Sequence, residues 1–248
     1  MKLLHDAQAS ASPTWDVGSA SLLWVEGTTV HRLHPGSATH TETVVPQPIG
    51  AVAPRTNGGL VGNLRDGIAL RDLDDRLTWL VYWHRDGAKA GPAAVDRTGR
   101  FWAVTGDQLV RVQPDGRAKV MLDGVAITGL ATSGLATSGL EEDDNLYLAT
   151  PDGVETLDAD TGERTPLCAG PAAGLCVDAE GCVWVAMPAA GQIRRLTPSG
   201  DIDRVLDVSG PTGCCFGGPD FTDLYITAGA VFVASAAGAG LPTARFPG

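Results

Sequence analysis

The sequence predicts an all-β fold, a six-bladed β-propeller with about four antiparallel strands per blade around a central channel. Two observations support this prediction: a strand-like unit recurs roughly every 40 residues, and apolar residues nowhere keep the spacing of an amphipathic helix. The six units are marked by short apolar runs at 22–25, 59–62, 100–103, 145–148, 182–185 and 223–226. We therefore expect residues 1–248 to form a single propeller domain.

Each apolar run is followed by a second strand, a turn and a return strand. Residues 30–33 and 109–112 alternate between polar and apolar types, and Pro, Asp or Gly follow them at 34–37 and 113–116. These residues favour turns because they preset backbone dihedrals or accept local hydrogen bonds. The lack of helical patterning disfavours an α/β domain, and the regular period disfavours the remaining alternative, a β-sandwich.

Composition narrows the possible partners. A hydrophobic content of 44% supports a substantial core, and 29 acidic against 18 basic residues give a net charge of −11. This charge argues against nucleic acid or an anionic membrane as a partner and suits a small neutral or cationic ligand. No run approaches the roughly 18 apolar residues of a membrane span, and the first residues lack the apolar segment of a signal peptide. We expect a cytoplasmic protein.

The five cysteines form neither an even disulfide framework nor a paired zinc motif. We expect reduced, mostly buried thiols. Cys214 and Cys215 lie on a predicted innermost strand, so one should face the channel and the other the blade interior. A nucleophilic thiol would need a nearby base to lower its pKa, and none is adjacent in sequence.

Several runs resemble the senescence-marker-protein (regucalcin), gluconolactonase and luciferin-regenerating family. These runs are 50–55 with 58–61, 95–102, 177–186, 216–227 and 240–246. The resemblance implies a six-bladed propeller with a divalent metal in its channel, held in the hydrolytic members by a Glu, an Asn and an Asp. The Asp is also thought to serve as general base.

Alignment on the family runs places these three ligands at Ala11, Thr128 and Ala173, with Ser133 as an alternative register for Thr128. None is a strong ligand, whereas Ca²⁺ needs about six to eight oxygens and Zn²⁺ about four donors. We expect no metal cofactor. The substrate-contacting Arg and Asn of the family fall at Lys89 and Gly91, so only a positive charge is retained.

The remaining blade entries are also small, which predicts a wide, dry channel mouth that accepts a ligand bulkier or more apolar than a sugar lactone. The residues assigned to ligand binding are Ala11, Ser12, Gly50, Trp83, Lys89, Gly91, Thr128, Ala173, Thr212 and Cys215.

The loop 82–89 is the richest source of catalytic groups. His84 could transfer a proton near neutral pH, Asp86 could orient it, and Lys89 could hold an oxyanion or carboxylate. The alternative is a solvated polar loop whose Tyr82 and Trp83 line a pocket or cap a blade.

Other polar residues are expected to serve the fold. Asp96, Asp178 and Asp220 should accept backbone hydrogen bonds in turns and so tie blades together. Asp16 and Glu26 are expected to be structural. The three histidines of the first unit are expected on the surface: His31, His34 and His40.

Together these features predict a metal-independent small-molecule enzyme, derived from a lactonase-like propeller, that hydrolyses, cyclises or isomerises a metabolite in its channel. Two alternatives stay open. One is a non-catalytic ligand-binding propeller, and the other is a metal-dependent lactonase with ligands relocated to Asp16, Glu26 or His84.

Overall fold

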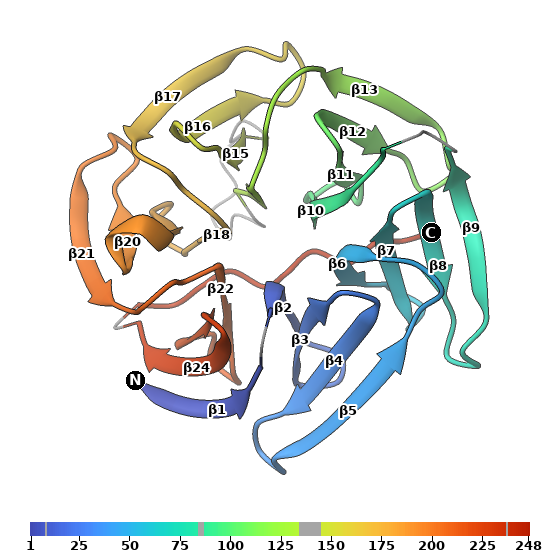
Figure 1. Ribbon diagram of the computed structural model, residues 1–248, viewed down its shortest axis with the longest axis horizontal. Coiled ribbons are helices and arrows are strands. Elements are labelled where there is room, and N and C mark those ends of the chain that lie inside the picture. The colour runs from blue at the N-terminus through green and yellow to red at the C-terminus, as the bar shows by residue number, and fades with distance from the viewer. Residues whose placement is uncertain (8, 84–86, 134–144, 237) are drawn as a thin grey trace.

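Six antiparallel sheets of four strands each stand around a central channel in the computed structural model (Figure 1). The structure describes residues 1–7, 9–83, 87–133, 145–236 and 238–248. The predicted six-bladed, all-β propeller is confirmed. Within the described ranges the one helical element is a 3₁₀ turn, Pro188–Ala190, and no helix there has the length and hydropathy of a membrane span.

The strands run in chain order from the channel outward in each of the first five blades. Blade 1 contains β2 (Ala11–Asp16), β3 (Ser21–Glu26), β4 (Thr29–His34) and β5 (Thr39–Val44). Blade 2 contains β6 (Ile49–Pro54), β7 (Leu60–Leu64), β8 (Gly67–Arg71) and β9 (Leu77–Tyr82). Blade 3 contains β10 (Ala90–Val95), β11 (Phe101–Thr105), β12 (Gln108–Val112) and β13 (Ala118–Leu122).

The second half of the chain repeats this order. Blade 4 contains β14 (Gly129–Thr132), β15 (Asn145–Ala149), β16 (Gly153–Asp158) and β17 (Arg164–Ala169). Blade 5 contains β18 (Leu175–Val177), β19 (Val183–Met187), β20 (Gln192–Leu196) and β21 (Ile202–Asp207). Blade 6 contains β22 (Gly213–Gly217), β23 (Asp223–Thr227), β24 (Ala230–Ser235) and, as its outermost strand, β1 (Lys2–Asp6).

The apolar runs of the sequence are the second strands of the blades. All five residues of β7, β11 and β19 are buried, because a second strand packs against neighbouring blades on both faces. Trp24, Trp102 and Trp184 occupy these strands and are no more than 1% exposed. Continuous apolar runs, rather than alternation, are what strands buried on both faces require.

The chain closes the ring by pairing its two ends. β1 is antiparallel to β24, with Lys2 opposite Val233. A β-bulge interrupts this pairing between Leu3 and His5.

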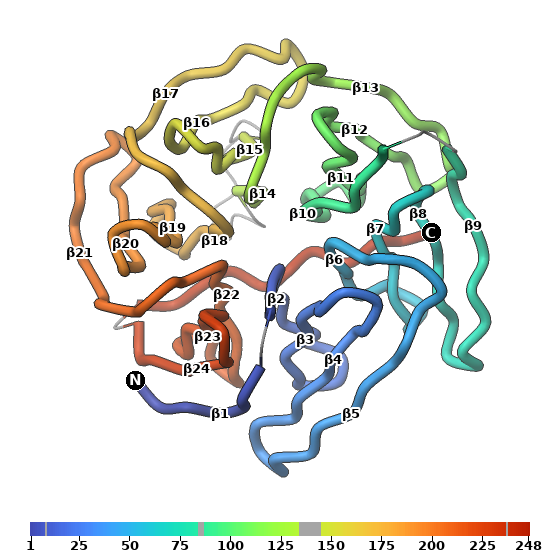
Figure 2. The backbone as a smooth tube through the Cα atoms, in the orientation of Figure 1, coloured from blue at the N-terminus to red at the C-terminus, as the bar shows by residue number. Residues whose placement is uncertain are grey.

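Residues 238–248 cross the end of the channel at which the inner strands finish (Figure 2). Gly240 bridges to Asp178 at the end of β18, and Phe246 bridges to Arg55 at the end of β6. Arg245 reaches Asp16 at 3.4 Å. We call residues 238–248 the C-terminal strap, since they contact blades on opposite sides of the ring.

Aspartates at the ends of inner strands hold the turns that follow. Asp96 accepts hydrogen bonds from the backbone of Thr98 and Arg100, and Asp178 accepts them from Glu180 and Cys182. Backbone acceptance is therefore confirmed at both, but these bonds lie within one blade. The expectation that they tie blades together is wrong, because each turn folds back onto its own sheet.

The other acidic residues in question differ in their surroundings. Asp220 is exposed. Asp16 is 6% exposed and accepts hydrogen bonds from Gly18, Ser19 and Arg32. Glu26 accepts a hydrogen bond from the Trp24 indole at 3.3 Å. Structural roles for Asp16 and Glu26 agree with these contacts.

The expected surface position of the histidines is wrong for His31, which is 7% exposed. Its ring stacks on Trp24, with ring centroids 4.9 Å apart. His34 and His40 are half-buried. Alternation along one hairpin could not reveal this burial, because the covering comes partly from the closing strand of blade 6.

Candidate functional site

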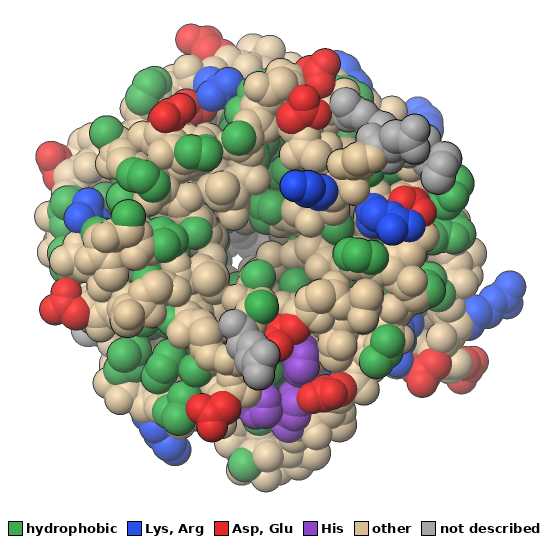
Figure 3. Space-filling view, in the orientation of Figure 1, with side chains coloured by type: hydrophobic (Ala, Val, Ile, Leu, Met, Phe, Trp, Pro, Cys, Tyr) green, Lys and Arg blue, Asp and Glu red, His purple; other side chains and the backbone are tan. Residues whose placement is uncertain are grey.

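A cavity of about 170 Å³ lies on the channel axis, where the space-filling view shows the molecule hollowed at its centre (Figure 3). The inner strands of all six blades border it, and the strap contributes residues 241–244 at the end where those strands finish. The fold thus brings together residues more than 200 positions apart in sequence, from Ala11 to Ala244.

The described lining of this cavity contains no charged side chain and no histidine. Its polar groups are the hydroxyls of Ser12, Thr14, Thr128, Thr132, Thr212 and Thr243 and the thiols of Cys176, Cys214 and Cys215. Alanine, valine, leucine, proline, glycine and one phenylalanine supply the rest. A surface of this kind favours an uncharged ligand, because a charged group would lose its hydration without gaining an ionic partner.

Five of the residues assigned to ligand binding border the cavity: Ala11, Ser12, Thr128, Thr212 and Cys215. Gly50, Gly91 and Ala173 lie at or beside the starts of inner strands but are not part of the lining. Trp83 packs between blades 2 and 3, and its backbone N–H donates to Asp66 at 2.8 Å. Lys89 is exposed just before β10. His84 and Asp86 lie outside the described residues.

Small residues at the mouth permit close contact between neighbouring blades. A Cβ at Gly50 would lie 2.2 Å from the carbonyl oxygen of Gly91, and one at Gly129 would lie 2.4 Å from that of Ala173. Real Cβ atoms do not approach backbone oxygens so closely. At these positions glycine therefore serves blade packing, and its small size does not widen the mouth.

Side-chain hydrogen bonds join blades at the same end of the channel. Thr128 donates to the carbonyl of Ala172 at 2.6 Å, and Thr212 donates to that of Ser10 at 2.7 Å. Asn63 donates to the carbonyl of Gly91 at 3.0 Å. Sequence reasoning missed Asn63, although an amide within the buried run 60–64 is a signal of such a bond.

The positions at which the sequence resemblance predicts metal ligands offer no set of donors that fits a metal ion. Ala11 and Ala173 offer methyl groups, and Ala173 packs against the apolar cluster between blades 5 and 6. The Thr128 hydroxyl is engaged with Ala172. The alternative position, Ser133, offers a hydroxyl and no carboxylate. Ca²⁺ normally requires carboxylate oxygens among its ligands, and these residues provide none.

The thiols of Cys176 and Cys215 are poor nucleophiles. Burial raises the pKa of the Cys176 and Cys215 thiols well above the usual value, and neighbouring Cys214 adds to both shifts. The Cys176 and Cys214 sulfurs lie 3.6 Å apart. Contrary to the expected division between channel and blade interior, Cys214 and Cys215 both border the cavity, and each also packs in a separate cluster between blades.

The chain is a six-bladed β-propeller with a cavity on its channel axis. Comparison with known proteins identifies the propeller family to which it belongs. The model of the SMP-30/Gluconolactonase/LRE-like region matches residues 9–134 and 169–230. The chain belongs to this family, which confirms the resemblance inferred from the sequence.

Relatives and solved structures agree with this assignment. The chain is 32% identical to 6-deoxy-6-sulfogluconolactonase of Pseudomonas putida, over 87% of this chain and 81% of that protein. It is 30% identical to regucalcin of Xenopus laevis, with the same coverages. The structure of a calcium-binding regucalcin from Agrobacterium tumefaciens superposes with a TM-score of 0.88 at 19% identity, covering 99% of this chain and 96% of that one. This last similarity concerns the fold.

Proposed function

We propose that the protein is a metal-independent small-molecule enzyme that hydrolyses, cyclises or isomerises an uncharged metabolite in the central cavity. Membership of a lactonase-like propeller family supports a hydrolase-like activity. The observation that carries the finer proposal is the cavity lining, in which all six blades meet without a charged side chain among the described residues.

The size of the cavity limits the substrate. On a comparable measure, an apolar cavity of about 150 Å³ holds one benzene molecule, and this cavity measures about 170 Å³. We therefore propose a substrate with one ring in the cavity, more apolar than a sugar lactone. A bulkier molecule would extend through the mouth.

Positioning supplies the main catalytic contribution in this proposal. Holding a reacting group in the right geometry can contribute about 7–11 kcal/mol to lowering the barrier, and hydroxyls such as those of Ser12 and Thr132 can orient a carbonyl or ring oxygen. For proton transfer the proposal keeps the groups expected from the sequence, His84 as base, Asp86 as its orienting partner and Lys89 as the cation for a developing negative charge. Lys89 is exposed and outside the cavity lining, so it would act from the mouth.

One specific observation favours a second candidate, a ligand-binding propeller without turnover. The described lining contains no carboxylate, histidine, lysine or arginine, and burial raises the pKa of the Cys176 and Cys215 thiols. In this case the ligand would raise the melting temperature and leave the protein unchanged.

A lactone panel assayed with and without EDTA distinguishes these functions. We expect turnover of an apolar lactone that persists in EDTA. Activity that is abolished by the chelator and restored by Ca²⁺ or Zn²⁺ would contradict metal independence. Thermal stabilisation by a compound that is never converted would identify the binding function instead.

A cavity-filling variant locates the site. Ala94→Phe adds a ring where β10 borders both the cavity and the apolar cluster between blades 3 and 4, so its melting temperature is measured alongside its activity. Ala118→Phe adds the same ring to the exposed outer strand of the same blade. Turnover or ligand stabilisation should be lost in the first variant and kept in the second. Equal activity in both would exclude the central cavity as the site.

A further inference from the structure

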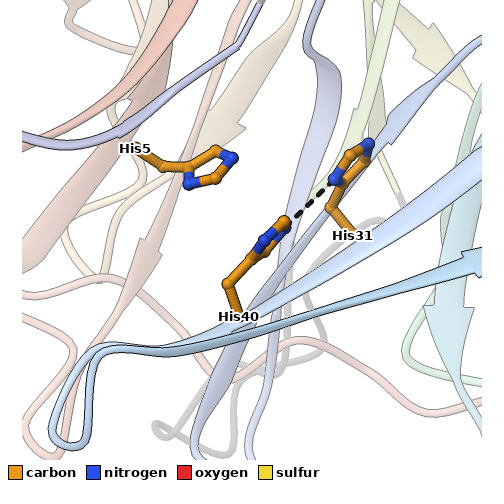
Figure 4. A group of neighbouring side chains, drawn as sticks. All are labelled: His5, His31 and His40. Carbon is orange, nitrogen blue, oxygen red and sulfur yellow. Dashed lines mark hydrogen bonds between the residues drawn. The ribbon is translucent and has the colours of Figure 1, made fainter.

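Three histidines from two blades converge where the ring closes, away from the central cavity. His5 lies on β1 of blade 6, and His31 and His40 lie on β4 and β5 of blade 1. Each offers one ring nitrogen, and these three atoms all lie within 4.8 Å of one another (Figure 4). The Nδ1 of His31 is 3.1 Å from the Nε2 of His40. The described cavity lining includes none of the three.

The local backbone explains this convergence. The β-bulge between Leu3 and His5 shifts the register of β1, and bulges commonly re-aim a side chain in this way. In blade 1, His31 is opposite Glu42 and His40 is opposite Leu33, so the two histidines are diagonal neighbours on one face of the hairpin.

The indole ring of Trp24 packs against two of the three imidazoles. The Trp24 ring stacks on His31 at 4.9 Å and on His40 at 5.5 Å between centroids, with interplanar angles of 8° and 12°. The His5 ring packs against the His40 ring in a tilted arrangement, with ring centroids 4.1 Å apart. The side chain of His31 is 9% exposed, and its Nε2 is a buried atom without a hydrogen-bond partner.

The charges around the cluster suit a cation. Burial lowers the pKa of His31, and the carboxylates of Glu26 and Glu42 only partly offset it. Burial, His5 and His31 lower the pKa of His40. Neutral imidazole is the form that ligates metals. Glu42 places a carboxylate oxygen 3.7 Å from the Nδ1 of His31, and Figure 3 shows acidic side chains beside the histidine patch.

We propose that His5, His31 and His40 bind a divalent transition-metal ion of the type that prefers imidazole, such as Zn²⁺ or Ni²⁺. With metal–nitrogen bonds of about 2.0–2.1 Å, tetrahedral ligand nitrogens lie roughly 3.4 Å apart, a spacing within the range already present in the cluster. The ion takes the place of the hydrogen bond between His31 and His40, the donor imidazole carries its proton on its other ring nitrogen, and Glu42 or water completes the coordination. Ca²⁺ and Mg²⁺ are not expected to bind here, because these ions prefer oxygen donors and the cluster offers imidazole nitrogens.

An ion at this position links β1 to blade 1. β1 otherwise belongs to the neighbouring sheet, where it pairs with β24. Metal binding would thus stabilise the seam at which the ring closes, and would do so independently of events in the central cavity.

The test uses the tag-free chain, stripped of metal, in calorimetric and thermal-shift titrations with ZnCl₂, NiCl₂ and CaCl₂. We expect one Zn²⁺ or Ni²⁺ per chain, a raised melting temperature and no effect of Ca²⁺. His5→Ala and His40→Ala should each weaken binding by more than about tenfold. His34→Ala is the matched control, since His34 is half-buried on β4 and outside the cluster.

The variants separate the site from its alternatives. His31 is left intact because its burial makes a folding defect the expected result of its removal. His40→Gln retains a hydrogen-bonding side chain, so a Gln variant that folds normally and loses the metal supports the proposal. Zn²⁺ binding that survives in both His5→Ala and His40→Ala would assign the ion elsewhere, for example to Cys176 and Cys214, and would overturn it. If the intact chain binds neither Zn²⁺ nor Ni²⁺, the proposal is wrong and the histidines only form a hydrogen-bonded stack on Trp24.

Discussion

Asp178 accepts a hydrogen bond from the indole nitrogen of Trp184 at 2.9 Å. The same carboxylate oxygen accepts from Arg195 at 2.7 Å, while its partner oxygen accepts from two backbone N–H groups. One buried side chain therefore fixes the inner turn, the second strand and the third strand of blade 5. Asp96 and Trp102 repeat the relationship in blade 3 at 2.7 Å.

Asp178→Ala should destabilise the fold by about 3–5 kcal/mol, the usual loss when one partner of a buried ion pair is removed. Urea unfolding followed by tryptophan fluorescence measures the change. Asp220→Ala is the control, because Asp220 is exposed in the corresponding turn of blade 6 and its removal should change the free energy of unfolding by less than about 0.5 kcal/mol. Similar losses in both variants would contradict the assignment.

Stability should fall in acid as Asp96 is protonated. Burial acts to raise the pKa of Asp96, but hydrogen bonds from Trp102, Thr98 and Arg100 outweigh it and hold the pKa below the ordinary 3.8. A depressed folded-state pKa gives stability that is present above the unfolded pKa and lost as pH falls through the folded value. Unfolding free energies measured from pH 6 to pH 3 should decline below about pH 4, and less steeply in Asp96→Asn. Equal slopes would exclude this contribution.

Gly129→Ala should cost about 1–3 kcal/mol, the range for overpacking a well-packed interior, because the added methyl meets the carbonyl of Ala173 in the next blade. Gly36→Ala should be close to neutral, since nothing lies within 4 Å of a Cβ there. Chemical denaturation of both variants tests the difference. A neutral Gly129→Ala would mean that the blades can separate locally at the mouth.

Cys176 and Cys215 should react slowly with a thiol reagent at pH 7.5. Burial raises the pKa of both, so the reactive thiolate is scarce. Spectrophotometric thiol titration in buffer should leave these two unmodified, whereas all five cysteines should react in denaturant. Peptide mapping identifies the modified residues. Rapid labelling of Cys215 in the folded protein would contradict the raised pKa of its thiol and make it a candidate nucleophile.

The propeller could be predicted because its evidence is local and repeated. Each buried second strand carries its own apolar run, as 101–105 and 183–187 do. Asp96 and Asp178 are each followed at the same intervals by the residues that they bind. Local patterns survive because neighbouring residues fold together within a blade.

The histidine cluster and the role of the small mouth residues could not be predicted in this way. His5 meets His40 only after ring closure and a bulge in β1, and Gly129 is constrained by a carbonyl in the next blade. Neither contact can be predicted from the strand register within one hairpin, because each joins two different blades. Cavity lining by residues 241–244 likewise depends on where the strap crosses the ring.

The pairing of Lys2 with Val233 has a consequence for how the protein folds. Most strand pairs join segments close in sequence and can form early, but this pair closes a loop spanning nearly the whole chain. Loop-closure entropy rises with length, and contacts between distant residues are slow to form. Refolding should therefore pass through an intermediate in which the blades are formed but the ring is still open. The unpaired edge of β24 in this intermediate is prone to association until β1 pairs with it. Dilution should favour closure within one chain, and crowding should favour exchange of that strand between two chains.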